Sequence, residues 1–68
     1  MTLEDYTWLS DNLIILQNVR MTPEQNTRLF AIYNAITGEN KPATSCGRCV
    51  LNVKKRLKFE YEKQRSKN

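Results

Sequence analysis

The sequence lacks several residue types on which common protein chemistries depend. Its 68 residues include no histidine and only two cysteines, two glycines and two prolines. General acid–base catalysis loses its usual side chains without histidine or paired carboxylates beside a nucleophile. Two isolated glycines also make no glycine-rich phosphate loop. We therefore predict a protein that is not an enzyme and carries no cofactor.

Long hydrophobic runs are also missing. The run at residues 13–16 contains four apolar residues, whereas a membrane span requires about 20. The N-terminus has neither the basic nor the apolar segment of a signal peptide. Two cysteines are too few for a disulfide framework. We expect a soluble protein that is not secreted by a signal peptide and does not act at a membrane.

Positive charge is present but is concentrated near the C-terminus. Residues 1–45 carry three basic and five acidic side chains, a net charge of −2, whereas residues 46–68 carry eight basic and two acidic ones, a net charge of +6. Any attraction to phosphates or to an acidic protein should therefore be local to this segment. The predicted basic face consists of Arg48, Lys54, Lys55, Arg56, Lys58, Lys63 and Arg65.

Capping signals divide the chain into three helices. Thr2 and Thr22 are hydroxyl caps followed by acidic or amide side chains, and Pro23 suits a first helical position. Gly38 suits the end of the second helix, since it adopts a left-handed conformation without steric cost. We predict an all-α three-helix bundle with helices near residues 3–19, 23–37 and 45–63, forming one domain over residues 1–63 with a basic tail at 64–68.

Helical periodicity assigns most apolar side chains to the core. The inward stripes are Tyr6, Leu9, Leu13 and Leu16 on the first helix, and Leu29, Ile32, Tyr33 and Ile36 on the second. The surplus is larger than a small domain readily buries, which favours a protein interface and leaves self-association open. The candidate partner-binding residues are Trp8, Ile14, Ile15, Phe30 and Phe59, and Leu51 belongs to the same surplus.

The segment TSCGRC, residues 44–49, contains the two cysteines. A structural zinc ion takes four ligands, and a single pair without histidine does not supply them. A thioredoxin-like redox site expects a preceding strand, which the sequence does not indicate. Cys46 and Cys49 instead share a predicted helical stripe with Val50, Val53 and Leu57. We prefer the interpretation that both are small buried side chains, and keep metal and redox roles as alternatives.

The segment IYNAITGENKPATSCGRCVLNVKKRLK, residues 32–58, resembles small proteins of tailed bacteriophages, notably those infecting Bacteroides and including crAss-like phages. The resemblance rests on Tyr33, Asn34, Gly38, Thr44, Ser45, Cys46 and Cys49. It implies a phage origin, and hence a location in the virion or the host cytoplasm. It implies no settled activity.

Two hypotheses for function follow. The first is a non-enzymatic phage protein that docks on a larger protein assembly, as an auxiliary, capsid-associated component of the virion. The second is a small protein that binds nucleic acid or the host transcription machinery through its basic C-terminal helix. The loop predicted at residues 38–44 is longer than the turn of a helix-turn-helix motif, which argues against sequence-specific DNA binding.

Overall fold

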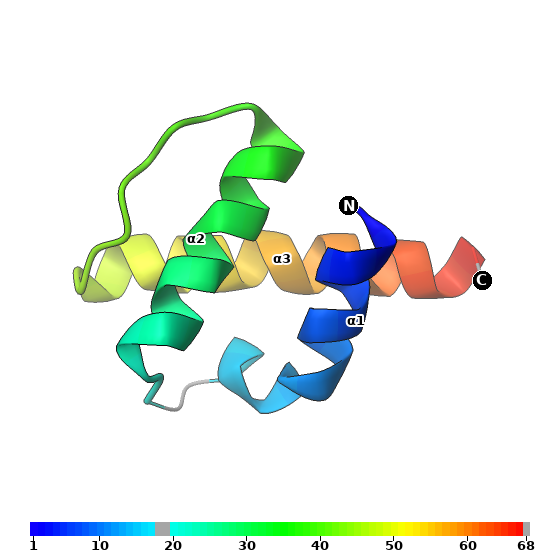
Figure 1. The fold of residues 1–68 in the computed structure, drawn as a ribbon, viewed down its shortest axis with the longest axis horizontal. Helices are drawn as coiled ribbons and strands as arrows, with labels where there is room; N and C mark the ends of the chain where they lie inside the picture. Colours follow the sequence, from blue (N-terminus) through cyan, green and yellow to red (C-terminus); the bar gives the residue numbers. More distant parts are fainter. Residues whose placement is uncertain (18–19, 68) are drawn as a thin grey trace.

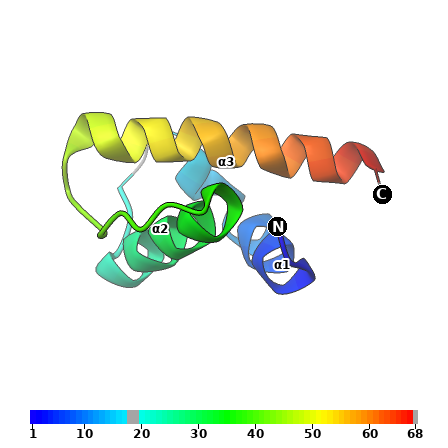
Figure 2. The same cartoon turned by 90° about the horizontal axis from the view of Figure 1, so that it is seen from above.

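The computed structural model describes residues 1–17 and 20–67, and the helices in this part of the chain form a three-helix bundle without strands. The elements are α1 (Leu3–Asp11), the 3-10 helix η1 (Leu13–Leu16), α2 (Pro23–Thr37) and α3 (Gly47–Lys67). α1 and α2 run in opposite directions and both cross α3 (Figure 1). They lie on the same side of α3, so that its other side is uncovered along its length (Figure 2). The predicted fold class is confirmed.

The bounds of α2 agree with the prediction because its capping residues act as expected. The Thr22 hydroxyl accepts a hydrogen bond from the Gln25 backbone N–H at 3.1 Å, and the Gln25 side chain accepts one from the Thr22 N–H at 2.9 Å. Gly38 ends the helix with φ +76°, and its N–H donates to the Asn34 carbonyl. This reciprocal cap and the left-handed glycine are both readable from sequence.

The first predicted helix is wrong beyond Asp11, because Asn12 interrupts it. The Asn12 side-chain amide donates to the Trp8 carbonyl at 2.8 Å and so competes with the backbone for that acceptor. The chain continues as η1, and residues 18 and 19 of the predicted helix lie outside the described residues. The interruption changes which residues face inward: Ile15 is buried, whereas Leu13, predicted for the core, is exposed.

The third helix begins and ends later than predicted. The Thr44 hydroxyl accepts from the Cys46 N–H at 3.2 Å, and the Cys46 carbonyl accepts from Val50, so that the first helical residue is Gly47 rather than residue 45. The helix then continues through most of the predicted tail, as far as Lys67. Arg65 and Lys67 lie in its last turn, where cations stabilise the negative end of a helix.

The core lies where α1, η1 and α2 meet α3. Tyr61 of α3 stacks on Tyr6 of α1 with 4.9 Å between ring centroids, and its hydroxyl is hydrogen-bonded to Ser10. Arg28 of α2 forms a 3.1 Å ion pair with Asp5 of α1 and lies over the Trp8 ring. The buried apolar residues are Leu9, Ile15, Leu29, Phe30, Ile32, Val53, Leu57 and Tyr61.

The loop between α2 and α3 is held against α2 by two asparagines. Asn34 exchanges two hydrogen bonds with the backbone of Lys41, at 2.8 and 3.0 Å, and Asn26 donates to the Thr44 carbonyl at 3.1 Å. The Tyr33 hydroxyl, with Lys41 nearby, lowers the pKa of Glu39. These contacts fix the point at which α3 begins.

Candidate functional site

The solvent-facing side of α3 is the largest concentration of positive charge in the structure. Helix geometry places Val53, Leu57 and Tyr61 on one side against the core, which turns most of the residues between them outward. Neither α1 nor α2 covers this outward side (Figure 2). We define the α3 basic face as the exposed cations Arg48, Lys55, Arg56, Lys58, Lys63, Arg65 and Lys67.

Only one member of this face takes part in an ion pair among the described residues. Arg56 pairs with Glu60 one turn later, at 3.1 Å. Within residues 1–17 and 20–67, no ion pair is formed by the other six members of the face. Their charge is therefore directed at solvent and is available to a polyanion.

Lys54 was predicted for the basic face, but the structure contradicts this. Its side chain is only 7% exposed, and its ammonium group donates to the Gln17 carbonyl at 3.1 Å. The residue stands on the core side of α3, where its methylene groups cover apolar side chains and its charge meets the carbonyl that follows η1. Lys54 therefore links α3 to η1 instead of facing a partner.

Two of the five candidate partner-binding residues also prove to be core residues. Ile15 and Phe30 are buried, at 1% and 2% exposure, and Trp8 packs half-buried against the core. Phe30 is buried because α2 packs against both α1 and α3, so that two sides of this helix face the core. Only Ile14 and Phe59 are fully available to another molecule.

Phe59 lies within the α3 basic face and is 61% exposed. Lys55 and Lys63 are one helical turn before and after it, so all three side chains lie on neighbouring positions of the same surface. Leu51 is exposed on the same helix. A large apolar ring between two cations is a surface that can contact both a phosphate backbone and the sugars or bases attached to it.

The interpretation of the cysteines as buried side chains is wrong. Both Cys46 and Cys49 are exposed free thiols. The first turn of α3 extends beyond α2 (Figure 1). No cluster of three or more histidine, cysteine or acidic side chains suited to a metal ion occurs in the described part of the chain.

The two neighbouring thiols shift each other's pKa in opposite directions. The Cys49 side chain, followed by the backbone N–H groups of Cys49 and Arg48, lowers the pKa of Cys46. The same contact with Cys46, together with desolvation, raises the pKa of Cys49. Cys46 is therefore the thiol that ionises first.

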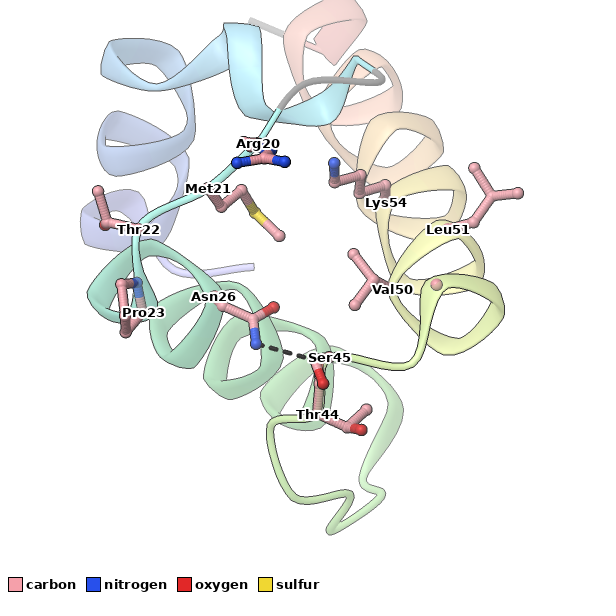
Figure 3. A pocket seen from close by; sticks show the side chains of 11 residues that line it. Arg20, Met21, Thr22, Pro23, Asn26, Thr44, Ser45, Val50, Leu51 and Lys54 are labelled. Atoms are coloured by element: carbon pink, nitrogen blue, oxygen red, sulfur yellow. Dashed lines mark hydrogen bonds between the residues drawn. The ribbon is translucent and has the colours of Figure 1, made fainter.

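A pocket of about 830 Å³ opens beside the start of α3, and the sequence did not indicate it. Arg20 and Lys54 point toward one another across it, and Met21 and Val50 point into it (Figure 3). Asn26 donates to Thr44, which leaves Asn26 Oδ1 as a buried acceptor without a hydrogen-bond partner among the described residues. The walls of the pocket come from segments far apart in sequence, so no local sequence pattern predicts them.

Fold and surface together define a small all-α protein with one long, solvent-facing basic helix. Comparisons with protein-family models, with curated proteins and with solved structures give no match for this chain. No helix in the described ranges is long and apolar enough to cross a membrane.

Proposed function

We propose that this protein binds nucleic acid through the phosphate backbone, using the α3 basic face. The observation that carries the proposal is the set of six exposed cations on α3 that have no acidic partner in the described residues. The proposal follows the second of the two functional hypotheses from the sequence. It is favoured because burial removes Ile15 and Phe30 from the surface on which the first depended.

The shape of the surface supports a helical nucleic acid as the ligand. α3 has 21 residues, so its axis is about 30 Å long. An α-helix with its side chains is about 10–12 Å across, and the major groove of B-DNA is about 12 Å wide. Because α1 and α2 lie behind α3, they do not obstruct its approach to such a groove (Figure 2).

The contacts would be to phosphates more than to base edges. Lysine and arginine on the α3 basic face surround its outer half, so a single approach brings only part of the set, about three or four side chains, near one duplex. Each phosphate contact adds affinity that falls with salt and carries no sequence information of its own. The nine residues between α2 and α3 also differ from the tight turn of a helix-turn-helix motif.

Fluorescence anisotropy of a labelled DNA duplex, measured over a series of salt concentrations, tests the proposal. We expect the logarithm of the binding constant to fall linearly with the logarithm of salt, with a slope near −3. Lys55→Gln with Lys63→Gln should weaken binding on all sequences and reduce that slope by about 2.

The matched control is Lys41→Gln, which removes one exposed lysine from the α2–α3 loop. Its slope should stay close to that of the unmodified protein. Binding that is insensitive to salt, or that Lys41→Gln weakens as strongly as the double substitution on α3 does, would exclude the α3 basic face as the phosphate-binding surface.

A second candidate is docking on a larger protein assembly, as an auxiliary virion component. The exposed apolar side chains Ile14 and Phe59 favour it. Mass spectrometry of purified particles of the parent phage tests it directly. This candidate requires many copies per particle, and absence from particles would refute it.

A further inference from the structure

Nucleic-acid binding makes no use of the two cysteines at the start of α3. A free cysteine is among the residue types most often buried, yet Cys46 and Cys49 are both exposed. They are the only thiols in the chain. Exposure of both thiols argues against a packing role and favours a role in which the sulfur atoms react.

Their spacing permits a disulfide bond within the first turn of the helix. Residues three apart on a helix have Cβ atoms about 5–6 Å apart, whereas a disulfide requires about 3.5–4.5 Å, so closing the bond needs a small shift of the backbone. Cys46 immediately precedes the first helical residue, and its carbonyl already accepts the Val50 N–H. Because Cys46 lies outside α3, this shift can be made at the residue before the helix.

The two thiols differ in a way that suits sequential chemistry. The neighbouring Cys49 side chain and backbone N–H groups lower the pKa of Cys46, whereas the pKa of Cys49 is raised. Thiolates, not thiols, attack disulfides. Cys46 is thus the attacking sulfur, and Cys49 remains a protonated thiol until the first step is complete.

The neighbouring pocket supplies an independent reason to expect a ligand. Ser45 and Gly47, on either side of Cys46, are part of its lining. Arg20, an exposed residue of the lining, gives the same pocket positive charge, which favours a ligand that carries carboxylates (Figure 3).

We propose that Cys46 and Cys49 form a thiol–disulfide exchange site for anionic peptide disulfides, with the adjacent pocket holding the peptide. The Cys46 thiolate attacks one sulfur of the substrate disulfide, forms a mixed disulfide and releases the first peptide thiolate. Cys49 then loses its proton to solvent and attacks Cys46 Sγ, which releases the second peptide thiolate. The two released thiolates take up protons. The protein is oxidised by two electrons to a Cys46–Cys49 disulfide, and the substrate disulfide is reduced to two thiols.

The experiment uses the full chain, reduced and freed of reductant, with oxidised glutathione as the anionic probe and cystamine as a cationic one. Acid-quenched samples are measured by intact mass and peptide mapping. The unmodified protein should lose two hydrogens and form an internal disulfide. Cys49→Ser should instead accumulate one glutathione on Cys46, and Cys46→Ser should react roughly tenfold more slowly at Cys49.

The pocket is tested separately from the thiols by Arg20→Gln, an exposed residue outside every helix. At low ionic strength it should slow the reaction with oxidised glutathione roughly twofold and leave or increase the rate with cystamine. Circular dichroism shows whether each variant remains folded.

Several results would overturn the proposal. These are trapping of glutathione mainly at Cys49, formation of intermolecular instead of internal disulfides, or equal effects of Arg20→Gln on the two probes. Retention of a metal ion that protects both thiols from glutathione would also overturn it and would assign the pair to metal binding.

Discussion

The most informative test of the core compares Phe30 with Phe59, the two phenylalanines of the chain. Both belonged to the predicted partner-binding set. The structure separates them, because Phe30 is 2% exposed in the core and Phe59 is 61% exposed on α3. The same substitution, to alanine, therefore measures burial directly, since residue type and change in volume are identical.

The expected magnitudes differ by several kcal/mol. Removing a buried phenylalanine ring costs about 3–5 kcal/mol, because transfer free energy is lost and a cavity remains. Substitution of an exposed residue away from any special feature changes stability by about 0.5 kcal/mol or less. A single core of this size rarely supplies more than about 3–5 kcal/mol. Phe30→Ala should consequently leave the chain largely unfolded, whereas Phe59→Ala should unfold almost like the unmodified protein.

Urea and thermal unfolding, followed by far-ultraviolet circular dichroism, provide the assay. For a domain of 68 residues, 1 kcal/mol corresponds to a shift of about 7 °C in Tm. Phe30→Leu keeps much of the apolar volume and should cost about 1 kcal/mol, so it gives a measurable transition if Phe30→Ala has none. Equal destabilisation by Phe30→Ala and Phe59→Ala, or a larger effect at Phe59, would refute the arrangement of α2 in the core.

Three further predictions concern individual contacts. Lys54→Ala should lower the free energy of unfolding by about 1–3 kcal/mol, because the Gln17 carbonyl loses a charged donor. Lys55→Ala, at the adjacent exposed residue, should change it by about 0.5 kcal/mol at most. Similar effects of both variants in urea unfolding would contradict the buried position of Lys54. Asn34→Ala should cost about 1 kcal/mol through the two hydrogen bonds to Lys41, with exposed Asn40→Ala as the control, and amide hydrogen exchange at Lys41 should increase only in the former. The folded-state pKa of Glu39 is lowered, so its contribution to stability is present above the unfolded-state pKa and is lost as pH falls through the folded-state pKa. Glu39→Gln should therefore slightly flatten the acid limb of a stability–pH profile. An unchanged profile would exclude the Tyr33 contact.

Local signals predicted the parts of the fold that depend on neighbours in sequence. The capping residues Thr22 and Gln25 and the terminator Gly38 specified α2 correctly, since each acts within four residues of the backbone group that it satisfies. The end of α1 at Asn12 could also have been predicted, because an asparagine side chain competes with helical backbone hydrogen bonds. Its effect was missed because the apolar repeat continued on both sides of it.

Burial at the candidate sites was less predictable. Cys46 and Cys49 continue the stripe of Val53 and Leu57, yet periodicity does not tell where the neighbouring helix stops. Lys54 resembles its charged neighbours in sequence, but its position on the helix and the nearby Gln17 carbonyl place it inside. The pocket beside α3 combines side chains from α2, the loops on both of its sides and α3.

Capping, periodicity and charge are local properties, so they were enough to predict an all-α chain, the bounds of α2 and the concentration of positive charge at one end. The packing of the helices, in contrast, sets which apolar and basic side chains reach solvent. Exposure depends on where α1 and α2 cross α3, and that crossing leaves the basic face, Phe59 and both thiols uncovered while it buries Phe30 and Lys54.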